Sequence, residues 1–205
     1  MRFPGLVAVR KAGAARTAVV VSVTMMLAGC GTRPAVNDTF SLATTPVVDR
    51  PASTGRQILV PEPTALKTLD SEQIVVRLSR SEIQFLARAQ WGDRLPRIVQ
   101  DKLVQTFENT GRVGGVGKPG QGLAIDYQVV TEIRAFEIST DGPDTAVVEI
   151  FAKLLDDRNG TVRRQRAFRA MAPVSGPGNP AFVSALDAAF AKVAADIVGW
   201  TLASI

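Results

Sequence analysis

The side chain with the most specific chemistry in this sequence is the thiol of its single cysteine, which ends the stretch Leu27-Ala28-Gly29-Cys30. A head that carries only basic charges and an uncharged run of residues 17–27 precede it, which is the order of a secretory signal ending at small residues. The pattern is typical of a bacterial lipobox, in which the thiol takes a diacylglycerol and small residues admit a peptidase. The freed amino group of Cys30 then accepts a further acyl chain, and two or more chains hold a protein firmly at a membrane. The sequence therefore predicts a signal peptide over residues 1–29, cleaved between Gly29 and Cys30, and a lipid anchor on Cys30.

This leader has two other interpretations: a plain secretory signal that happens to precede a cysteine, and a transmembrane anchor. The apolar run is too short for the second, because a spanning helix needs about 20 residues. Gly31 follows the cysteine, whereas aspartate is usual there in lipoproteins that stay at the inner membrane. We therefore expect a protein at the periplasmic face of the outer membrane, held there through its lipid.

The rest of the chain offers little for catalysis, because it contains no histidine. Nucleophilic systems that use histidine are excluded, and with Cys30 acylated no zinc site can be built from cysteine and histidine. We expect no catalytic residue, no metal ligand and no cofactor other than the covalent diacylglycerol and N-acyl lipid on Cys30. An aspartic dyad stays open as an alternative, although Asp156-Asp157 fit a hairpin turn. The other acids are spaced along predicted strands as solvent-facing positions would be: Asp126, Glu132, Glu137 and Glu149.

Residues 115–120 satisfy the pattern G-x-G-x-x-G, which suggests a phosphate-binding loop. That loop needs a strand before it and a helix after it, so that the helix N-terminus meets the anion. Here a predicted helix precedes the glycines and a predicted strand follows, and Pro119 stands where a Walker A loop has serine or threonine. We expect a loop that binds no nucleotide.

Basic residues gather at one predicted hairpin and in the strand that follows it: Arg158, Arg163, Arg164, Arg166 and Arg169. An ordinary solvated face explains such a run, and the functional alternative is contact with anionic lipid headgroups or an acidic partner surface. Nucleic acid is not expected, because the aromatic platforms that stack bases are missing. The charge balance agrees, since 20 basic residues from Cys30 onward oppose 19 acidic residues and leave a net charge of +1.

Length and periodicity predict one domain over residues 56–205, preceded by a tether over residues 30–55. The apolar island Phe40-Ser41-Leu42 in that tether is expected to dock on the domain as a short strand. Residues 81–90 fit a strand or a single amphipathic turn, and Trp91-Gly92 is interpreted as a turn. Strands are predicted at 57–60, 73–78, 123–139, 145–155 and 161–171, the last three as an antiparallel meander.

Two helices complete the predicted elements. The first has Asp93 as its expected N-cap, Pro96 in its first turn and Gly111 as its C-cap. The second spans about residues 180–202, with Asp187, Lys192 and Asp196 on its solvent side. Its apolar stripe consists of Phe182, Leu186, Phe190, Val193, Ile197 and Thr201. The predicted fold class is therefore α+β, an antiparallel β-sheet with two helices packed on one face.

The order of these features resembles the ABC-type transport auxiliary lipoprotein family, over about residues 39–203. The matching residues are, in order, Phe40-Ser41-Leu42, Ile58-Leu59-Val60-Pro61, Leu69-Asp70, Gln73-Ile74-Val75-Val76-Arg77, Glu82-Ile83, Phe85, Ala89-Gln90-Trp91, Pro96, Asp126-Tyr127, Ile133, Ala135-Phe136-Glu137 and Leu154-Leu155-Asp156.

The resemblance implies a periplasmic, non-enzymatic accessory of an MCE-type ABC transport system that moves phospholipid or other hydrophobic molecules. Its implied partner is the MCE-domain protein of that transporter, and a homo-oligomer stays open. The alternatives are a structural or assembly lipoprotein of the outer membrane and, as a third class, a lipid-anchored hydrolase that uses acids only.

Overall fold

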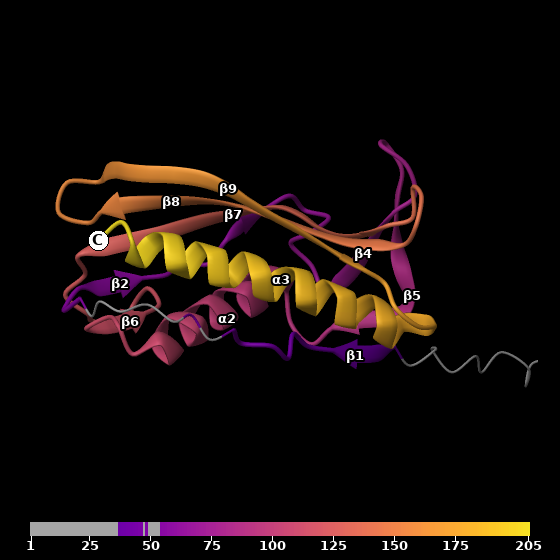
Figure 1. The fold of residues 1–205 in the computed structure, drawn as a ribbon, viewed down its shortest axis with the longest axis horizontal. Helices are drawn as coiled ribbons and strands as arrows, with labels where there is room; N and C mark the ends of the chain where they lie inside the picture. Colours follow the sequence, from indigo (N-terminus) through magenta and orange to yellow (C-terminus); the bar gives the residue numbers. More distant parts are fainter. Residues whose placement is uncertain (1–36, 47, 49–53) are drawn as a thin grey trace, which may run out of the picture. The chain divides into compact units, whose positions relative to one another are not determined.

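Three long strands dominate the computed structural model, which describes residues 37–46, 48 and 54–205 (Figure 1). They are β7 (Tyr127–Ser139), β8 (Thr145–Asp156) and β9 (Thr161–Pro173), paired antiparallel in chain order. The predicted meander is thus confirmed. The turn between β8 and β9 contains Gly160 at φ 69°, a left-handed conformation that glycine adopts without strain.

The strands that precede the meander pair with β7 in the parallel sense. They are β2 (Gln57–Leu59), β3 (Thr64–Ala65) and β4 (Gln73–Arg77), which follow one another along β7. The α+β class is confirmed, but the expectation of a purely antiparallel sheet is corrected to a mixed one. Prolines at 61 and 63 explain the interruption, since proline cannot donate to a ladder and the chain resumes further along β7.

Residues 81–90, which the sequence left between strand and turn, form a strand. This strand is β5 (Ile83–Trp91), antiparallel to β4, and β1 (Asp38–Phe40) lies parallel to it. Trp91 therefore ends a strand instead of opening a turn. It is buried, and its ring meets the Phe136 ring edge-on at 5.8 Å between centroids.

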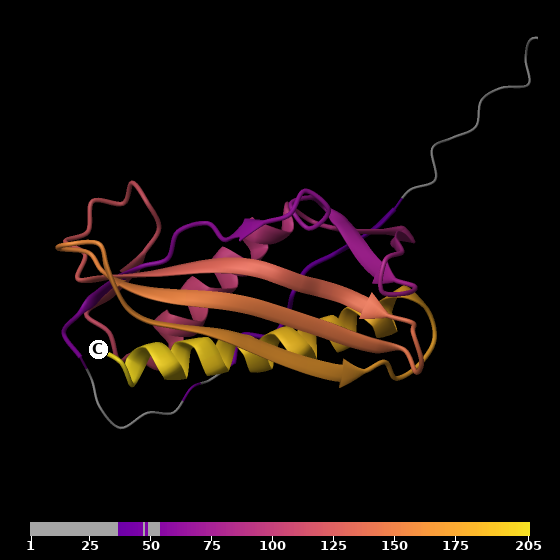
Figure 2. The ribbon, with the colours of Figure 1, turned by 90° about the horizontal axis from the view of Figure 1, so that it is seen from above.

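Both helices cover the same face of the sheet, as predicted; the second view shows them beneath the meander (Figure 2). They are α2 (Leu95–Thr110) and α3 (Gly178–Leu202). Gly111 caps α2 in the left-handed conformation, as expected, but the N-cap is Arg94 and not Asp93. The Asp93 carboxylate instead accepts a bond from the adjacent Arg94 N–H (2.6 Å) and lies 3.5 Å from the Arg97 guanidinium. The short β6 (Gly115–Gly117) after α2 pairs with β2, so the first three residues of the expected loop form a strand.

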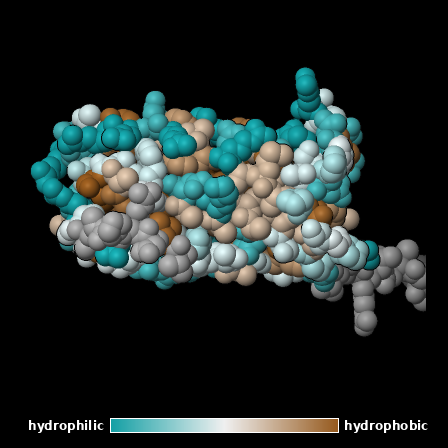
Figure 3. Space-filling view, viewed as in Figure 1, coloured by the Kyte–Doolittle hydropathy of each residue, from teal (hydrophilic) through white to brown (hydrophobic). Residues whose placement is uncertain are grey.

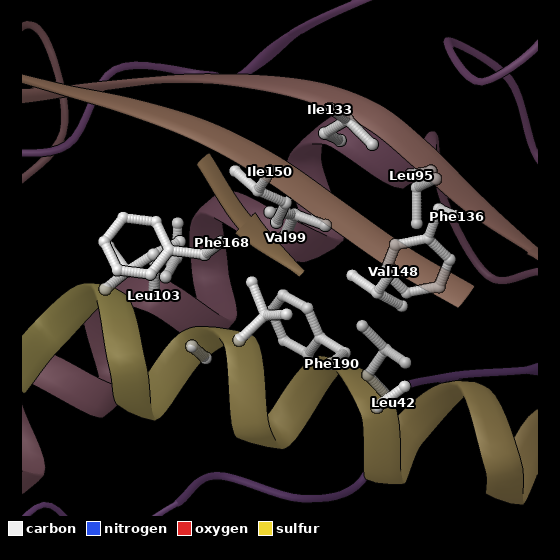
Figure 4. Close-up of a cluster of buried hydrophobic side chains, with 14 of the residues drawn as sticks. Leu42, Leu95, Val99, Leu103, Ile133, Phe136, Val148, Ile150, Phe168 and Phe190 are labelled. Carbon is white, nitrogen blue, oxygen red and sulfur yellow. The ribbon is translucent and has the colours of Figure 1, made fainter. Parts of the chain in front are cut away.

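The core lies between the sheet and the helices. All but the first member of the predicted α3 stripe are buried, and Phe182 is partly buried. Figure 4 shows side chains of the sheet, of both helices and of the segment after β1 meeting there, among them Leu42, Leu95, Val99, Leu103, Ile133, Phe136, Val148, Ile150, Phe168 and Phe190.

Leu42 extends this core into the segment that the sequence assigned to the tether. It is 1% exposed, and the compact unit runs from Asn37 to Ile205. The carboxylate of Asp187 on α3 accepts bonds from the Ala43 N–H (3.0 Å) and from the Thr44 N–H (3.1 Å) and hydroxyl (2.6 Å). Residues 37–46 therefore belong to the folded unit, and Asp187 holds them instead of simply facing solvent.

Candidate functional site

The predicted lipid-attachment and cleavage residues, Cys30 and Gly29, lie outside the residues that the structure describes. The lipid anchor therefore stays a prediction. Within the described part of the chain, neither helix combines the length and apolar character needed to cross a membrane. The same residues contain no group of three or more acidic or thiol side chains placed to hold a metal ion.

Two aspartates at the hairpin end of the meander lie in a cluster of arginines. The Asp126 carboxylate accepts bonds from the Arg56 guanidinium (3.0 Å) and from the Gln57 N–H (3.0 Å). The backbone N–H of Gln57, followed by the guanidinium of Arg56, lowers the pKa of Asp126 below its ordinary value. This cluster joins the start of β2 to the start of β7.

The second aspartate of the cluster, Asp156, ends β8 and is buried. Its carboxylate accepts two bonds from the Arg163 guanidinium, at 3.2 and 2.6 Å, and one from the Arg158 N–H at 3.2 Å. These partners, with Arg163 the largest contributor, lower the pKa of Asp156. The bond from the Arg158 N–H is the turn chemistry expected from the sequence, and the pair with Arg163 adds a partner that the sequence did not predict.

A pocket of about 120 Å³ lies among these groups, lined by Arg56, Asp126, Tyr127, Asp156, Arg158 and Arg163. An aspartic dyad needs one carboxyl whose pKa is raised so that it can hold a proton. The pKa values of Asp126 and Asp156 are both lowered, which is the opposite of what the proton-holding member of a dyad requires. The arrangement is an ionic clamp that joins β2, β7 and the hairpin between β8 and β9.

The other predicted acids divide between partnered and exposed positions. Glu137, expected to face solvent, is buried, because its carboxylate accepts two bonds from the Arg77 guanidinium at 2.5 and 2.8 Å. Glu132 is exposed beside Arg134 (3.2 Å), and Glu149 lies 3.6 Å from Arg169. Periodicity could not reveal the roles of Arg56 and Arg77, because their carboxylate partners lie 70 and 60 residues away along the chain.

The five arginines of the predicted basic cluster do not form one patch. Arg158 and Arg163 belong to the ionic clamp, and Arg169 pairs with Glu149. Arg164 and Arg166 are exposed on β9, and neither makes an ion pair with a described residue; Arg166 lies over the Phe168 ring at 5.2 Å. The surface in Figure 3 is hydrophilic along much of the upper rim, where β9 runs in Figure 1.

Strand β9 is also the open side of the meander. In the part of the chain that the structure describes it pairs with β8 alone, over its whole length. Eleven of its 13 residues are exposed or partly exposed, and Phe168 and Ala170 are the buried ones. An unpaired strand edge is a template for another chain, which makes β9 the candidate interaction site of this molecule.

Comparison with known proteins identifies the group to which these features belong. The model of a family described as ABC-type transport auxiliary lipoprotein component matches residues 39–198. A crystal structure of a Xanthomonas campestris protein assigned to family DUF330 superposes with a TM-score of 0.76 at 29% identity, covering 82% of this chain and 95% of that one. A hypothetical protein from Chlamydia trachomatis shares the fold at a TM-score of 0.51 and 10% identity, over 73% of this chain and 99% of its own.

A curated relative extends beyond the matched region. This uncharacterised protein of Bradyrhizobium diazoefficiens is 30% identical over 176 residues, which is 85% of the present chain and 47% of the relative. The chain thus spans about half the length of that relative.

Proposed function

Because the chain belongs to the ABC-type transport auxiliary lipoprotein family, we propose that it is the lipid-anchored accessory of an MCE-type ABC transport system. That system moves phospholipid or other hydrophobic molecules across the envelope. The accessory faces the periplasm from the outer membrane and works by contact with the MCE-domain protein, not by catalysis. The observation that carries this proposal is the family match over residues 39–198, nearly all of the described unit.

The chemistry of the described residues supports a contact role. The carboxylates of Asp126 and Asp156 are paired with arginines that lower their pKa values, and the family is described as a transport auxiliary lipoprotein component. The polar clusters tie strands together, and β9 leaves a long strand edge open to a partner.

The anchor is the first part of the proposal to test. Replacing Cys30 by serine removes the thiol that takes the diacylglycerol, so we expect an unprocessed or soluble protein in place of a membrane-bound one. Fractionation and intact-mass measurement of the two forms give the readout, and density-gradient separation of the two membranes tests outer-membrane residence. Normal maturation and membrane sedimentation of the Cys30→Ser variant would refute the lipid anchor.

The partner is tested by cross-linking in intact cells followed by mass spectrometry. We expect an MCE-domain protein as the leading partner of the wild-type chain, and its loss with Cys30→Ser, because the variant no longer resides at the membrane. Recovery of barrel-assembly or cell-wall partners without any MCE protein would favour a structural or assembly lipoprotein.

A further inference from the structure

Along one edge of β9, the backbone groups have no partner strand among the described residues. The Val174 N–H donates to the Asp144 carbonyl (3.0 Å), directly beyond the pair Thr145–Pro173. In an antiparallel ladder, residues that face the partner strand alternate with residues that face away, and the register has no shift between Arg164 and Pro173. The residues whose N–H and C=O groups point away from β8 are therefore Gln165, Ala167, Arg169 and Met171, which we call the free edge.

The two faces of β9 beside the free edge differ in chemistry. Arg164 and Arg166 lie opposite Leu154 and Ala152, both buried on the helix side, so these two guanidinium groups share that side. The other face carries the exposed apolar side chains of Met171 (59%) and Val162 (45%) beside the polar Gln165 and Arg169, and Arg169 is paired with Glu149. A strand that adds here meets Arg164 and Arg166 on one face and, on the other, apolar side chains interrupted by Gln165 and Arg169.

The charge of β9 also decides against a second copy of this chain as the occupant. The strand contains four arginines and no acidic residue, and only Arg163 and Arg169 are paired with carboxylates. Two copies paired edge to edge would bring Arg164 and Arg166 of each within reach of the other's. Like charges on adjacent strands destabilise the pairing, and charged edge residues are a common protection against self-association.

We propose that the free edge of β9 binds an extended acidic segment of a partner protein as an added strand. Main-chain bonds to the free edge supply the pairing, and acidic side chains at alternate positions meet Arg164 and Arg166. Apolar side chains at the intervening positions cover Met171 and Ala167. This is strand addition with specificity from alternate side chains, and it goes beyond the proposed transport role because it names the chemistry recognised and not the protein that carries it.

The test uses the full protein and a blocked peptide of alternating glutamate and valine, and it follows the amides of the compact unit from Asn37 onward. Amide hydrogen exchange followed by NMR should show fast exchange at the free edge in the unbound protein. The acidic peptide should slow exchange at these four amides by about tenfold or more, while a peptide of alternating lysine and valine should not.

Two variants isolate the charge and the backbone. Arg164→Glu with Arg166→Glu should abolish protection by the acidic peptide, while the charge-matched control Lys67→Glu with Arg80→Glu, at exposed sites elsewhere, should leave it unchanged. Ala167→Pro removes an outward N–H and no bond to β8, so it should weaken binding in a protein that still folds; should it fail to fold, the charge-reversal pair carries the test.

Several outcomes would overturn the proposal. Equal protection by both peptides, protection confined to amides outside β9, or no protection at millimolar peptide would each do so. A concentration-dependent dimer of the free protein that protects the same four amides would assign the edge to a second copy instead. Failure to recover an MCE protein in cells bears on the proposed transport role and leaves this peptide result standing.

Discussion

Strands β8 and β9 are neighbours of nearly equal length, 12 and 13 residues, but they differ in burial and in the number of strands with which they pair. Strand β8 pairs on both sides, with β7 and β9, and its even-numbered residues from Ala146 to Leu154 are all buried on the helix side. Strand β9 pairs on one side and buries two residues. Their compositions follow: β8 is rich in valine, isoleucine and leucine, and β9 in arginine. A strand's place in a sheet is thus set as much by what it keeps in water as by what it buries.

The largest expected effect comes from truncating a matched pair of apolar side chains in the two strands. Ile150→Ala in β8 should lower the free energy of unfolding by about 2–5 kcal/mol, because it empties a fully buried site. Met171→Ala in β9 should change it by less than about 1 kcal/mol, because that side chain is 59% exposed. Denaturant unfolding of both variants measures the difference. Equal losses would mean that the outer face around Met171 is covered in solution.

An intermediate effect is expected from the ion pair that lies beside β8 on the sheet's outer face. Glu137 stands opposite Val147 of β8 and Val75 of β4. Glu137→Ala leaves the partly buried Arg77 guanidinium without its carboxylate partner. We therefore expect the free energy of unfolding, measured with denaturant, to fall by about 1–3 kcal/mol. The exposed pair Glu132 and Arg134 serves as control, and Glu132→Ala should cost less than about 0.5 kcal/mol. A loss at Glu137 no larger than the control would show that burial of this pair has no energetic consequence.

The ionic clamp at the end of β8 predicts a dependence of stability on pH. The pKa values of Asp126 and Asp156 are lower in the folded protein than the unfolded value near 4. Their contribution is therefore fully present above about pH 4 and is lost as the pH falls through the lower folded values. Thermal unfolding between pH 6 and 2 should show a smaller acid-induced drop in Tm for Asp126→Asn with Asp156→Asn than for wild type. An identical drop in Tm for the variant and the wild type would show that the ionic clamp does not contribute to the pH dependence of stability.

The smallest effect is expected in the segment that follows β1, which Asp187 on α3 binds through hydrogen bonds. Asp187→Asn weakens the acceptor that serves Ala43 and Thr44, at a cost of about 1 kcal/mol. Faster amide exchange at Thr44 with little change in Tm is the expected result, because the segment is local. Asp196→Asn, which removes only the exposed pair with Lys192 (3.1 Å), should leave Thr44 unchanged.

Sequence patterns predicted the elements that depend on local information. The meander follows from the long alternating segments and from the Asn159-Gly160 turn between two of them. Gly111 and the α3 stripe follow from helix-end chemistry and a period of 3.6 residues. Strands β2 and β4 were predicted as strands too, at 57–60 and 73–78. The two-residue β3 and the parallel pairing of all three with β7 were not predicted, because their partners on β7 lie many positions later in the chain.

The candidate sites divide in the same way. The run of arginines in β9 was visible in the sequence, but whether each one is paired or free depends on Asp156 and Glu149 across the ladder. The burial of Glu137 and the pairing of Asp126 depend on arginines 60 and 70 residues away. No spacing rule connects residues at such distances, so only the topology could bring them together.

The burial of Leu42 bears on how far this domain can travel from the membrane. With the lipid on Cys30 as proposed, the tether ends where the compact unit begins, at Asn37, and not near residue 55 as the sequence suggested. A fully extended chain spans at most about 3.6 Å per residue, so the contour length from the acylated cysteine to the fold is about 25 Å. A tether of this contour length keeps the domain close to the surface of the bilayer. It thereby raises the effective concentration of the domain against any partner rooted in the same membrane.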